Sequence, residues 1–420
     1  MTAETRLKAD VTNDAPEVTP GLPLLAAFAI TPSVHKTPLN LTLPSRESGF
    51  SFLVRNTTAQ DERFHDAFVI LENAIAARAF PACSLTVSFR GELVVHKALG
   101  RFTYDPASPE VSAASIFDLA SLTKVVATTA MAMILYERGL LDLEAPVSAI
   151  VPDFAGALDN NDPRRREITL RMLLAHSSGL PAYEKLFLRA KTPEDLLQAA
   201  FITPLSAAPG TRAEYSDIGF IILGVALERL ADESLDAFCQ REIFGPLGMT
   251  HTTFNPANAL KDSIPPTAND RTFRRRIIQG EVQDENASVL GGIAGHAGLF
   301  SAAEDLAIFA HAILNGGYPI LRSATVELFS RRESAPEGTS RALGWDTPSL
   351  PMPSQSGKYF SPRSFGHLGY TGTSLWIDAE CQLSITLLTN RTWPDCQNQA
   401  IKQVRPAFHD AVIETLRKNA

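Results

Sequence analysis

Two residues in the first third of the chain, Ser121 and Lys124, have types and spacing that could carry covalent chemistry. The uncharged residues 125–136 follow them and predict a helix that is buried on every side. On such a helix Lys124 lies about one turn from Ser121 on the same face, so its amine can reach the hydroxyl. The same spacing at Ser33 and Lys36 falls in a proline-rich stretch, and the helical context therefore favours Ser121.

This pair could form a nucleophile and its base. A serine hydroxyl becomes a strong nucleophile only when a base removes its proton, and a lysine can be that base only while it is neutral. Burial and the positive end of a helix dipole both lower the pKa of a lysine. The N–H of Ser121 at the same helix start could stabilise an oxyanion. The alternative is a serine helix cap beside an unrelated lysine.

A second candidate group stands in the turn before the apolar residues 218–230, where Tyr215 and Asp217 lie two positions apart. Beside a serine and a lysine, Tyr215 could pass a proton to the leaving group, provided that nearby positive charge lowers the pKa of its hydroxyl. A tyrosine that precedes a buried helix is otherwise a packing residue with its hydroxyl in water.

A third candidate group lies in the glycine-rich residues 365–373, which contain His367, Gly369 and Tyr370. Glycines at this density mark a bulge or the close approach of another backbone. We expect a substrate to lie along this strand edge, with the backbone N–H of Tyr370 as a second oxyanion donor. The alternative is an ordinary bulged edge strand with a solvated His367.

Hydrophobic periodicity predicts the elements that must position these groups. They are helices at 62–80 and 397–418 and β-hairpins at 84–98 and 374–389. Strands at both ends with helices between them predict an α/β (α+β) fold, in which an antiparallel sheet is built from both chain ends and flanked by helices, plus an all-helical lobe. A cleft between the sheet and that lobe is where a site is expected.

The same pattern predicts the domain boundaries. The proline-rich residues 1–60 are expected to form an extended arm or disordered leader. The catalytic domain is expected at 61–420, with its sheet lobe at about 61–120 and 340–420 and its helical lobe at about 121–339.

Three ordered motifs of this chain resemble those of the penicillin-recognising serine hydrolases, which include class C β-lactamases, D-alanyl-D-alanine carboxypeptidases, D-aminopeptidases and family VIII carboxylesterases. The motifs are Ser121 with Lys124, Tyr215 with Asp217, and His367 with Gly369. Residues 173–181, 246–249 and 291–300 also look like this family, and the resemblance spans roughly 62–415.

The resemblance implies a β-lactamase/transpeptidase-like fold and an acyl-enzyme on Ser121, with Lys124 and Tyr215 handling the protons. It implies substrate-binding roles at the second and third motifs, namely for Asp217, His367, Gly369 and Tyr370. The expected substrate is a small-molecule ester, an amide or a D-amino-acid peptide. This chemistry needs neither a metal nor an organic cofactor.

Two departures from the family pattern bear on specificity. His367, largely neutral near pH 7, stands where many members have a lysine that helps to hold an anionic group. Asp217 stands where asparagine is usual: facing Lys124 it would raise the pKa of that lysine and oppose its role as base, whereas facing the cleft it could hold a cationic group. Esterase, D-peptidase and β-lactamase activities stay open, as does a catalytically weak module that binds a ligand or partner.

Composition and residue spacing limit the kinds of partner that we expect for this protein. The net charge is −8, and the short basic runs at 164–166 and 274–276 are interpreted as solvated loops, so nucleic acid is not expected. The four cysteines and nine histidines show no metal-ligand spacing, and His176 and His296 are interpreted as structural. The apolar residues 22–30 are too short to span a bilayer and lack an export-signal pattern. A cytoplasmic location is expected by default, with a periplasmic or secreted one left open.

Overall fold

The computed structural model describes residues 53–156, 162–349 and 354–418. All of them belong to one of the two units into which the chain divides, residues 50–420. The predicted leader therefore lies almost entirely outside the described residues, as do Ser33 and Lys36.

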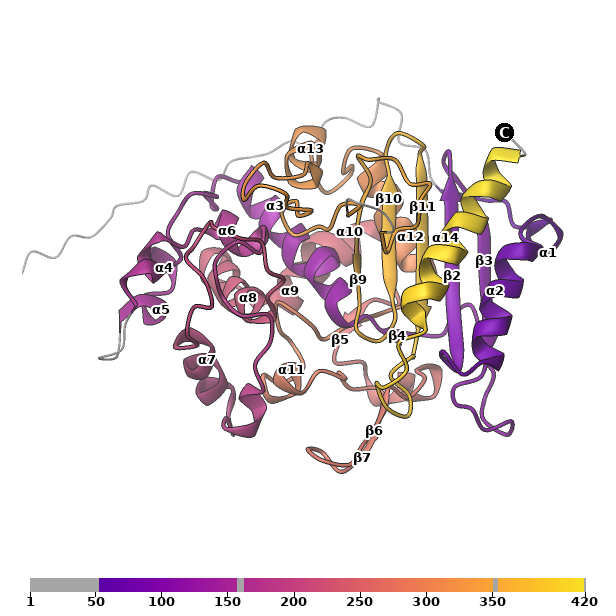
Figure 1. The fold of residues 1–420 in the computed structure, drawn as a ribbon, viewed down its shortest axis with the longest axis horizontal. Helices are drawn as coiled ribbons and strands as arrows, with labels where there is room; N and C mark the ends of the chain where they lie inside the picture. The colour runs from indigo at the N-terminus through magenta and orange to yellow at the C-terminus, as the bar shows by residue number, and fades with distance from the viewer. Residues whose placement is uncertain (1–52, 157–161, 350–353, 419–420) are drawn as a thin grey trace, which may run out of the picture. The chain divides into compact units, whose positions relative to one another are not determined.

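A six-stranded sheet joins segments from both ends of this unit (Figure 1), in the order β1-β3-β2-β11-β10-β9. All neighbours are antiparallel except β1 and β3, and β11 pairs with β2, which joins the late strands to the early ones. The predicted sheet is therefore confirmed. The strands are β1 (Val54–Arg55), β2 (Ala82–Phe89), β3 (Glu92–Gly100), β9 (Phe365–Leu368), β10 (Ser374–Asp378) and β11 (Leu383–Thr389).

The first hairpin turns at the two residues that the sequence indicated. Arg90 and Gly91 have φ values of 51° and 83°. Left-handed conformations at both positions are what a two-residue type I′ turn requires, and this turn type matches the twist of paired strands. Phe89 and Glu92 are accordingly partners on either side of the turn.

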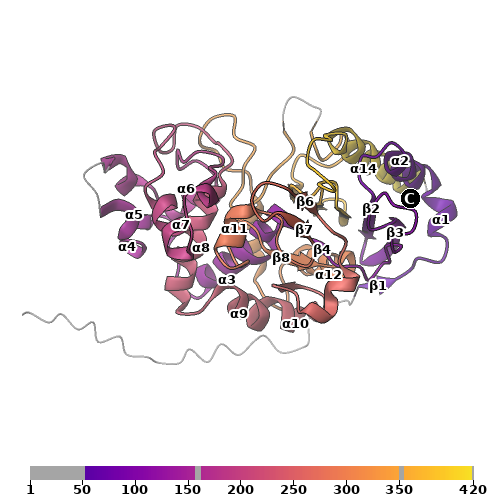
Figure 2. The same ribbon diagram turned by 90° about the horizontal axis from the view of Figure 1, so that it is seen from below.

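Helices cover both faces of the sheet (Figure 2), and they are α2 (His65–Ala76), α12 (Ala303–Leu314) and α14 (Ile401–Lys418). Leu85 and Val87 of β2 belong to the apolar cluster that also contains residues of α2 and α14. Thr86, which points the other way, donates a hydrogen bond to the carbonyl of Ala303 at the start of α12, at 3.1 Å. Because both faces are covered, β2 and β11 are buried along nearly their whole length.

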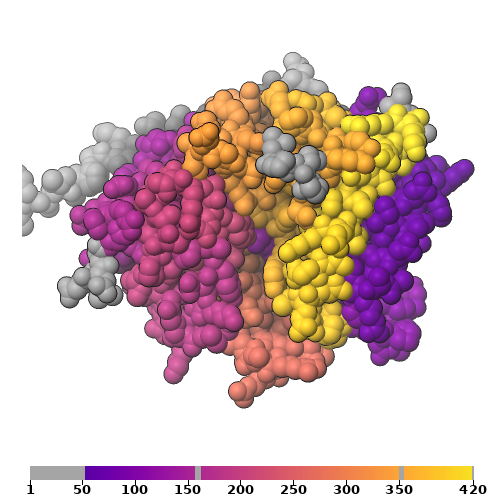
Figure 3. All heavy atoms as spheres, viewed as in Figure 1, coloured from indigo at the N-terminus to yellow at the C-terminus, as the bar shows by residue number. Residues whose placement is uncertain are grey.

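The middle of the chain is mostly helical and gathers beside β9 at the sheet edge (Figures 1 and 2). Its longest helix, α8 (Asp217–Ala231), is buried along most of its length. Figure 3 shows the surface hollowed between this helical part and the late strands. The other helices are α1 (Gln60–Arg63), α3 (Ala130–Glu137), α4 (Val147–Ile150), α5 (Asp153–Gly156), α6 (Leu170–Leu174), α7 (Pro193–Phe201), α9 (Leu235–Cys239), α10 (Gly245–Leu247), α11 (Glu285–Val289) and α13 (Ser323–Ser330).

The lobe predicted to be all-helical also contains short strands. β5 (Thr253–Phe254) and β8 (Leu299–Ser301) form a small sheet with β4 (Phe117–Asp118), and β6 (Ala268–Asp270) pairs with β7 (Arg276–Ile278). Strands of two or three residues are too short to show a period of two, so the sequence pattern could not reveal them. None of the helices in the described ranges has the length and apolar composition that crossing a bilayer requires.

A contact between two glycines sets how closely α8 approaches the segment that leads to β8. A Cβ added at Gly295 would lie 2.2 Å from the carbonyl oxygen of Phe220, and 3.0 Å from Cα of Gly224. We expect Gly295→Ala to lower the free energy of unfolding by about 1–3 kcal/mol through overpacking. Urea denaturation measures this, with Gly156→Ala as the control because nothing lies within 4 Å of its added Cβ. Equal stability of the two variants would contradict the close packing.

Candidate active site

Ser121 begins a helical segment that is buried but is not one regular α-helix. A 3₁₀ turn at Ala120–Leu122 is followed by a π-helical stretch at Lys124–Thr129 and then by α3. Ala120 has a φ of 46°, a left-handed conformation that costs free energy for a residue with a side chain. The predicted burial is confirmed for residues 125–135, whereas Tyr136 is 36% exposed. Irregular helical geometry of this kind is common at functional sites and leaves no simple period in a sequence.

Four side chains meet at this helix start. Lys124 Nζ lies 3.0 Å from Ser121 Oγ and 2.7 Å from Asp217 Oδ1. The hydroxyl of Tyr215 lies 2.6 Å from Ser121 Oγ and 3.0 Å from Asp217 Oδ1. The structure therefore brings together the three residues predicted to do chemistry, and adds Asp217 as a shared acceptor.

Lys124 has a third partner that the sequence did not point to. Its Nζ donates to the backbone carbonyl of His296 at 3.0 Å, and the ring of His296 contacts Asp284 Oδ1 through Nε2 at 2.9 Å. Thr128 fixes the same segment of chain, because its hydroxyl donates a hydrogen bond to the carbonyl of the preceding residue, Gly295, at 2.7 Å. The sequence pointed to the segment 291–300 only as family-like. In the structure its backbone carbonyls accept hydrogen bonds from Lys124 and Thr128.

Electrostatics at this cluster act on the lysine and the tyrosine in opposite directions. Complete burial lowers the pKa of Lys124, against the opposing effect of Asp217, which raises it. Burial raises the pKa of Tyr215 well above its ordinary value, and Asp217 raises it further. The sequence argument required a lowered pKa at Tyr215, so that condition is wrong and the phenol is protonated at neutral pH.

The sequence left open whether Asp217 faces Lys124 or the cleft, and its two carboxylate oxygens differ in this respect. It is the first residue of α8, whose N-cap Ser216 accepts the N–H of Gly219 at 3.0 Å. Its Oδ1 faces Lys124, whereas Oδ2 has no hydrogen-bond partner among the described residues, and the side chain is 15% exposed. One oxygen therefore serves the lysine and the other is open to a ligand.

His367 lies close to the cluster but is not solvated, which corrects the alternative of an exposed edge histidine. The side chain is buried, with Nδ1 2.8 Å from the carbonyl of Leu368 and its ring centroid 5.9 Å from that of Tyr215. Burial, Lys124 and Arg341 all lower the pKa of His367. The ring is therefore neutral and offers no positive charge to an anionic substrate.

Gly369 allows the backbone of the third motif to pack closely against the residues that precede Ser121. A Cβ at this position would lie 1.9 Å from Thr373 Oγ1 and 2.5 Å from the carbonyl oxygen of Leu119. Thr373 Oγ1 donates to that same carbonyl at 3.0 Å. The glycine is needed because the two backbones approach so closely, which agrees with the expectation from sequence.

Tyr370 follows at the surface, and its side chain is 48% exposed. Its carbonyl accepts from Arg391 Nε at 2.7 Å, and the guanidinium lies 4.5 Å from its ring centroid. The backbone N–H of Tyr370 and that of Ser121 have no hydrogen-bond partner in the described part of the chain. Both are thus available to a ligand oxygen.

Arg341 is a cation that sequence reasoning missed. Its guanidinium lies 5.6 Å from the ring centroid of Tyr215 and pairs with Asp346. It stands in an irregular segment with no motif, so only the tertiary structure could reveal its position. His176, interpreted as structural, accepts the N–H of Ser216 through Nδ1 at 3.0 Å.

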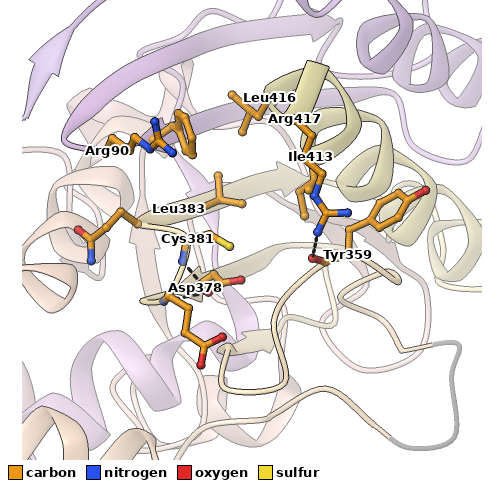
Figure 4. Close-up of a pocket in the computed structure, with 11 residues that line it drawn as sticks. Arg90, Tyr359, Asp378, Cys381, Leu383, Ile413, Leu416 and Arg417 are labelled. Atoms are coloured by element: carbon orange, nitrogen blue, oxygen red, sulfur yellow. Dashed lines mark hydrogen bonds between the residues drawn. The ribbon is translucent and has the colours of Figure 1, made fainter. Parts of the chain in front are cut away.

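A separate hollow of about 300 Å³ lies at the end of the sheet beside α14 (Figure 4). Leu383, Ile413 and Leu416 line it, and Arg417 at its rim donates to the carbonyl of Tyr359 at 3.1 Å. None of the residues predicted from the sequence for the site lines this hollow. Among the described residues, no group of three histidine, cysteine or acidic side chains could hold a metal ion.

Comparison with known proteins places this chain in a family. Residues 69–405 match the Beta-lactamase family. A relative from Salmonella agona named "Putative D-alanyl-D-alanine carboxypeptidase" is 31% identical over 404 residues, covering 88% of this chain and 90% of the relative. The chain therefore belongs to the Beta-lactamase family, and a function of the serine hydrolase type is supported in general terms.

Two further similarities agree with that assignment. A Bacillus subtilis protein named "N-acetylmuramyl-L-alanine amidase" is 31% identical over 405 residues, covering 87% of this chain and 88% of the relative. The solved structure of EstCE1, described as a hydrolase with promiscuous acyltransferase activity, has a TM-score of 0.68 at 20% identity, covering 84% of this chain and 100% of the other. The structural similarity supports the β-lactamase/transpeptidase-like fold.

Because Lys124 and Asp217 form a buried ion pair, substitutions at these two residues should change the free energy of unfolding non-additively. Lys124→Met leaves the carboxylate of Asp217 without its cation, so we expect Lys124→Met with Asp217→Asn to be more stable than Lys124→Met alone. Urea denaturation of both single variants and the double variant measures the coupling free energy, which should exceed about 1 kcal/mol.

The exposed pair of Lys97 with Asp61 is the matched control. Its nitrogen and oxygen are 2.5 Å apart, with side chains 23% and 71% exposed. The coupling between Lys97→Met and Asp61→Asn should stay below about 1 kcal/mol, because solvent screens the pair. Equal coupling in the two cycles would show that burial does not strengthen the inner pair.

Proposed function

We propose that this protein is a serine hydrolase that cleaves an ester or amide bond through an acyl-enzyme on Ser121. The observation that carries the proposal is the buried amine of Lys124, 3.0 Å from Ser121 Oγ. A neutral amine has two hydrogens and one lone pair. Asp217 Oδ1 and the carbonyl of His296 accept the two hydrogens, which leaves the lone pair for the serine proton.

In the proposed first step Ser121 Oγ attacks the substrate carbonyl while Lys124 takes its proton. The unpartnered N–H groups of Ser121 and Tyr370 would receive the developing oxyanion. Tyr215 is 2.6 Å from Ser121 Oγ and protonated, so it is placed to give its proton to the leaving group. Water then releases the acyl group by the same steps in reverse.

Two observations bear on the substrate. The relatives named as a D-alanyl-D-alanine carboxypeptidase and an N-acetylmuramyl-L-alanine amidase favour an amide of a small alanine-containing peptide. The neutral, buried His367 lacks the charge with which a lysine would hold an anionic group. We therefore place peptide amides and simple esters ahead of β-lactams.

The nucleophile can be tested directly. We expect Ser121→Ala to slow hydrolysis of p-nitrophenyl butyrate by about 10³-fold or more, because Ser121 carries the only aliphatic hydroxyl that contacts Lys124 Nζ among the described residues. A fluorophosphonate should add once to the wild-type protein and not to this variant, as read by intact-protein mass spectrometry. Ser112→Ala should behave as wild type, because the Ser112 hydroxyl hydrogen-bonds only to Ser115 among the described residues.

An unchanged rate in Ser121→Ala would refute the assignment. Absence of the adduct from the wild-type protein would instead favour the ligand-binding module, in which Asp217 keeps Lys124 protonated and Ser121 unreactive.

The role of Lys124 as base predicts the direction of a pH shift. Activity that needs the neutral amine rises with pH through the pKa of Lys124. Asp217 raises that pKa, so Asp217→Asn should lower it and move the acidic limb of kcat/KM to lower pH. The measurement is the pH profile of p-nitrophenyl butyrate hydrolysis. A limb that stays in place or moves upward would show that another group is the base.

A further inference from the structure

The turn between β9 and β10 carries the proposed second oxyanion donor, and one hydrogen bond fixes the peptide of that donor. The N–H of Gly372 donates to the carbonyl of Gly369 at 3.0 Å, which closes a four-residue turn. The N–H of Tyr370 belongs to the same planar peptide as the carbonyl of Gly369 and points the other way. The direction of this N–H therefore depends on whatever holds Gly372 in place.

Thr389, the last residue of β11, holds the next peptide of this turn. Its hydroxyl donates to the carbonyl of Thr371 at 2.8 Å, and the N–H of Arg391 donates to the same oxygen at 3.0 Å. Because this carbonyl and the N–H of Gly372 belong to one peptide, both donors also act on the hydrogen bond that closes the turn. A chain of two peptides therefore runs from the Thr389 hydroxyl to the proposed oxyanion donor.

Strand register brings Thr389 to this turn. Ser374 of β10 pairs with Leu387 of β11, so Gly372, two residues before Ser374, lies beside Thr389. A Cβ added at Gly372 would lie 2.1 Å from Thr389 Oγ1, and the φ of 94° at this glycine is one that residues with a side chain rarely adopt. The close approach that this glycine allows places the hydroxyl of a fully buried threonine against the turn.

Two buried guanidinium groups donate to other carbonyls of the same turn. Arg391 Nε donates to the carbonyl of Tyr370 at 2.7 Å, and Arg405 Nη2 donates to that of Gly372 at 3.1 Å. Neither arginine has a carboxylate partner in the described part of the chain. The turn that would receive the oxyanion is therefore held by positive charge that no acid offsets, which favours negative charge developing there.

We propose that Thr389 is a positioning residue for the reaction at Ser121, because its hydroxyl orients and polarises the N–H of Tyr370 through the two intervening peptides. The inference rests on the proposed function. Hydrogen bonds that follow one another in a buried chain strengthen each other, and each proton stays on its donor. The stronger N–H is worth most when the substrate oxygen carries negative charge. The effect therefore falls on the rate rather than on binding of the neutral substrate.

Thr389→Val tests the role, because valine keeps the shape of threonine and removes the hydroxyl. Thr386→Val is the matched control, since both threonines are buried on β11 and Thr386 Oγ1 has no hydrogen-bond partner among the described residues. We expect Thr389→Val to lower kcat for p-nitrophenyl butyrate about tenfold relative to the control, less than the roughly 10²–10³-fold loss caused by removing a whole oxyanion donor. KM should stay within about twofold, because acylation and deacylation both form an oxyanion and slow alike.

Three further readouts separate positioning from a general structural role. Thr389→Ser keeps the hydroxyl and should recover most of kcat. The acidic limb of the kcat/KM profile should stay at its wild-type pH in Thr389→Val, because the surroundings of Lys124 are unchanged. The inhibition constant of propylboronic acid should rise by the same factor as kcat falls, because its tetrahedral adduct on Ser121 carries negative charge at the oxyanion position. If Thr389→Val lacks the wild-type circular dichroism spectrum, Thr389→Ala and Thr386→Ala give the same comparison.

The outcomes distinguish this role from the proposed function. Equal kcat in Thr389→Val and Thr386→Val, a loss that appears in KM alone, or a Thr389→Ser variant as slow as Thr389→Val would overturn the role of Thr389. Any of these results, together with ester hydrolysis that Ser121→Ala abolishes, would keep the hydrolase. Wild-type protein that neither hydrolyses the ester nor takes a fluorophosphonate adduct would refute the hydrolase and the role of Thr389 with it.

Discussion

The burial of one amine is the constraint on which this site depends. Lys124 is fully buried, which is costly for a charged group, and its three partners are all oxygen atoms. A neutral amine satisfies all three with two hydrogens and one lone pair, whereas an ammonium would donate to all three. The same packing therefore supports both protonation states: burial, the larger effect, lowers the pKa of Lys124, and the carboxylate of Asp217 opposes it.

Distant parts of the chain hold this amine in place. The glycine-rich turn after β9 is bound to the residues before Ser121, since Thr371 and Thr373 donate to the carbonyls of Asp118 and Leu119 at 2.8 and 3.0 Å. From the helical side, Gly295 packs against α8 and places the carbonyl of His296 on the lysine. The sheet edge and α8 thus fix the site from opposite sides. The mixed fold is needed because the proposed oxyanion donors and proton-transfer groups come from both parts.

Local sequence patterns predicted those features that depend on local structure. The hairpin at Arg90 and Gly91, the buried helix after Ser121, and the order of the three motifs each follow from short stretches of chain. What could not be predicted depends on neighbours that are distant in sequence. The position of Arg341, the burial of His367 and the raised pKa of Tyr215 all come from such neighbours. The direction in which Asp217 faces was open for the same reason.

Asp217 also shows how the type of one residue changes the charge balance at a buried lysine. An asparagine at this position would present one acceptor oxygen and one donor nitrogen, and would carry no charge. An aspartate presents two acceptors and a negative charge, so Oδ1 stabilises the protonated lysine. The charge opposes the base at neutral pH, because the amine must be neutral before it can take the proton of Ser121. Burial acts in the other direction and favours the neutral amine.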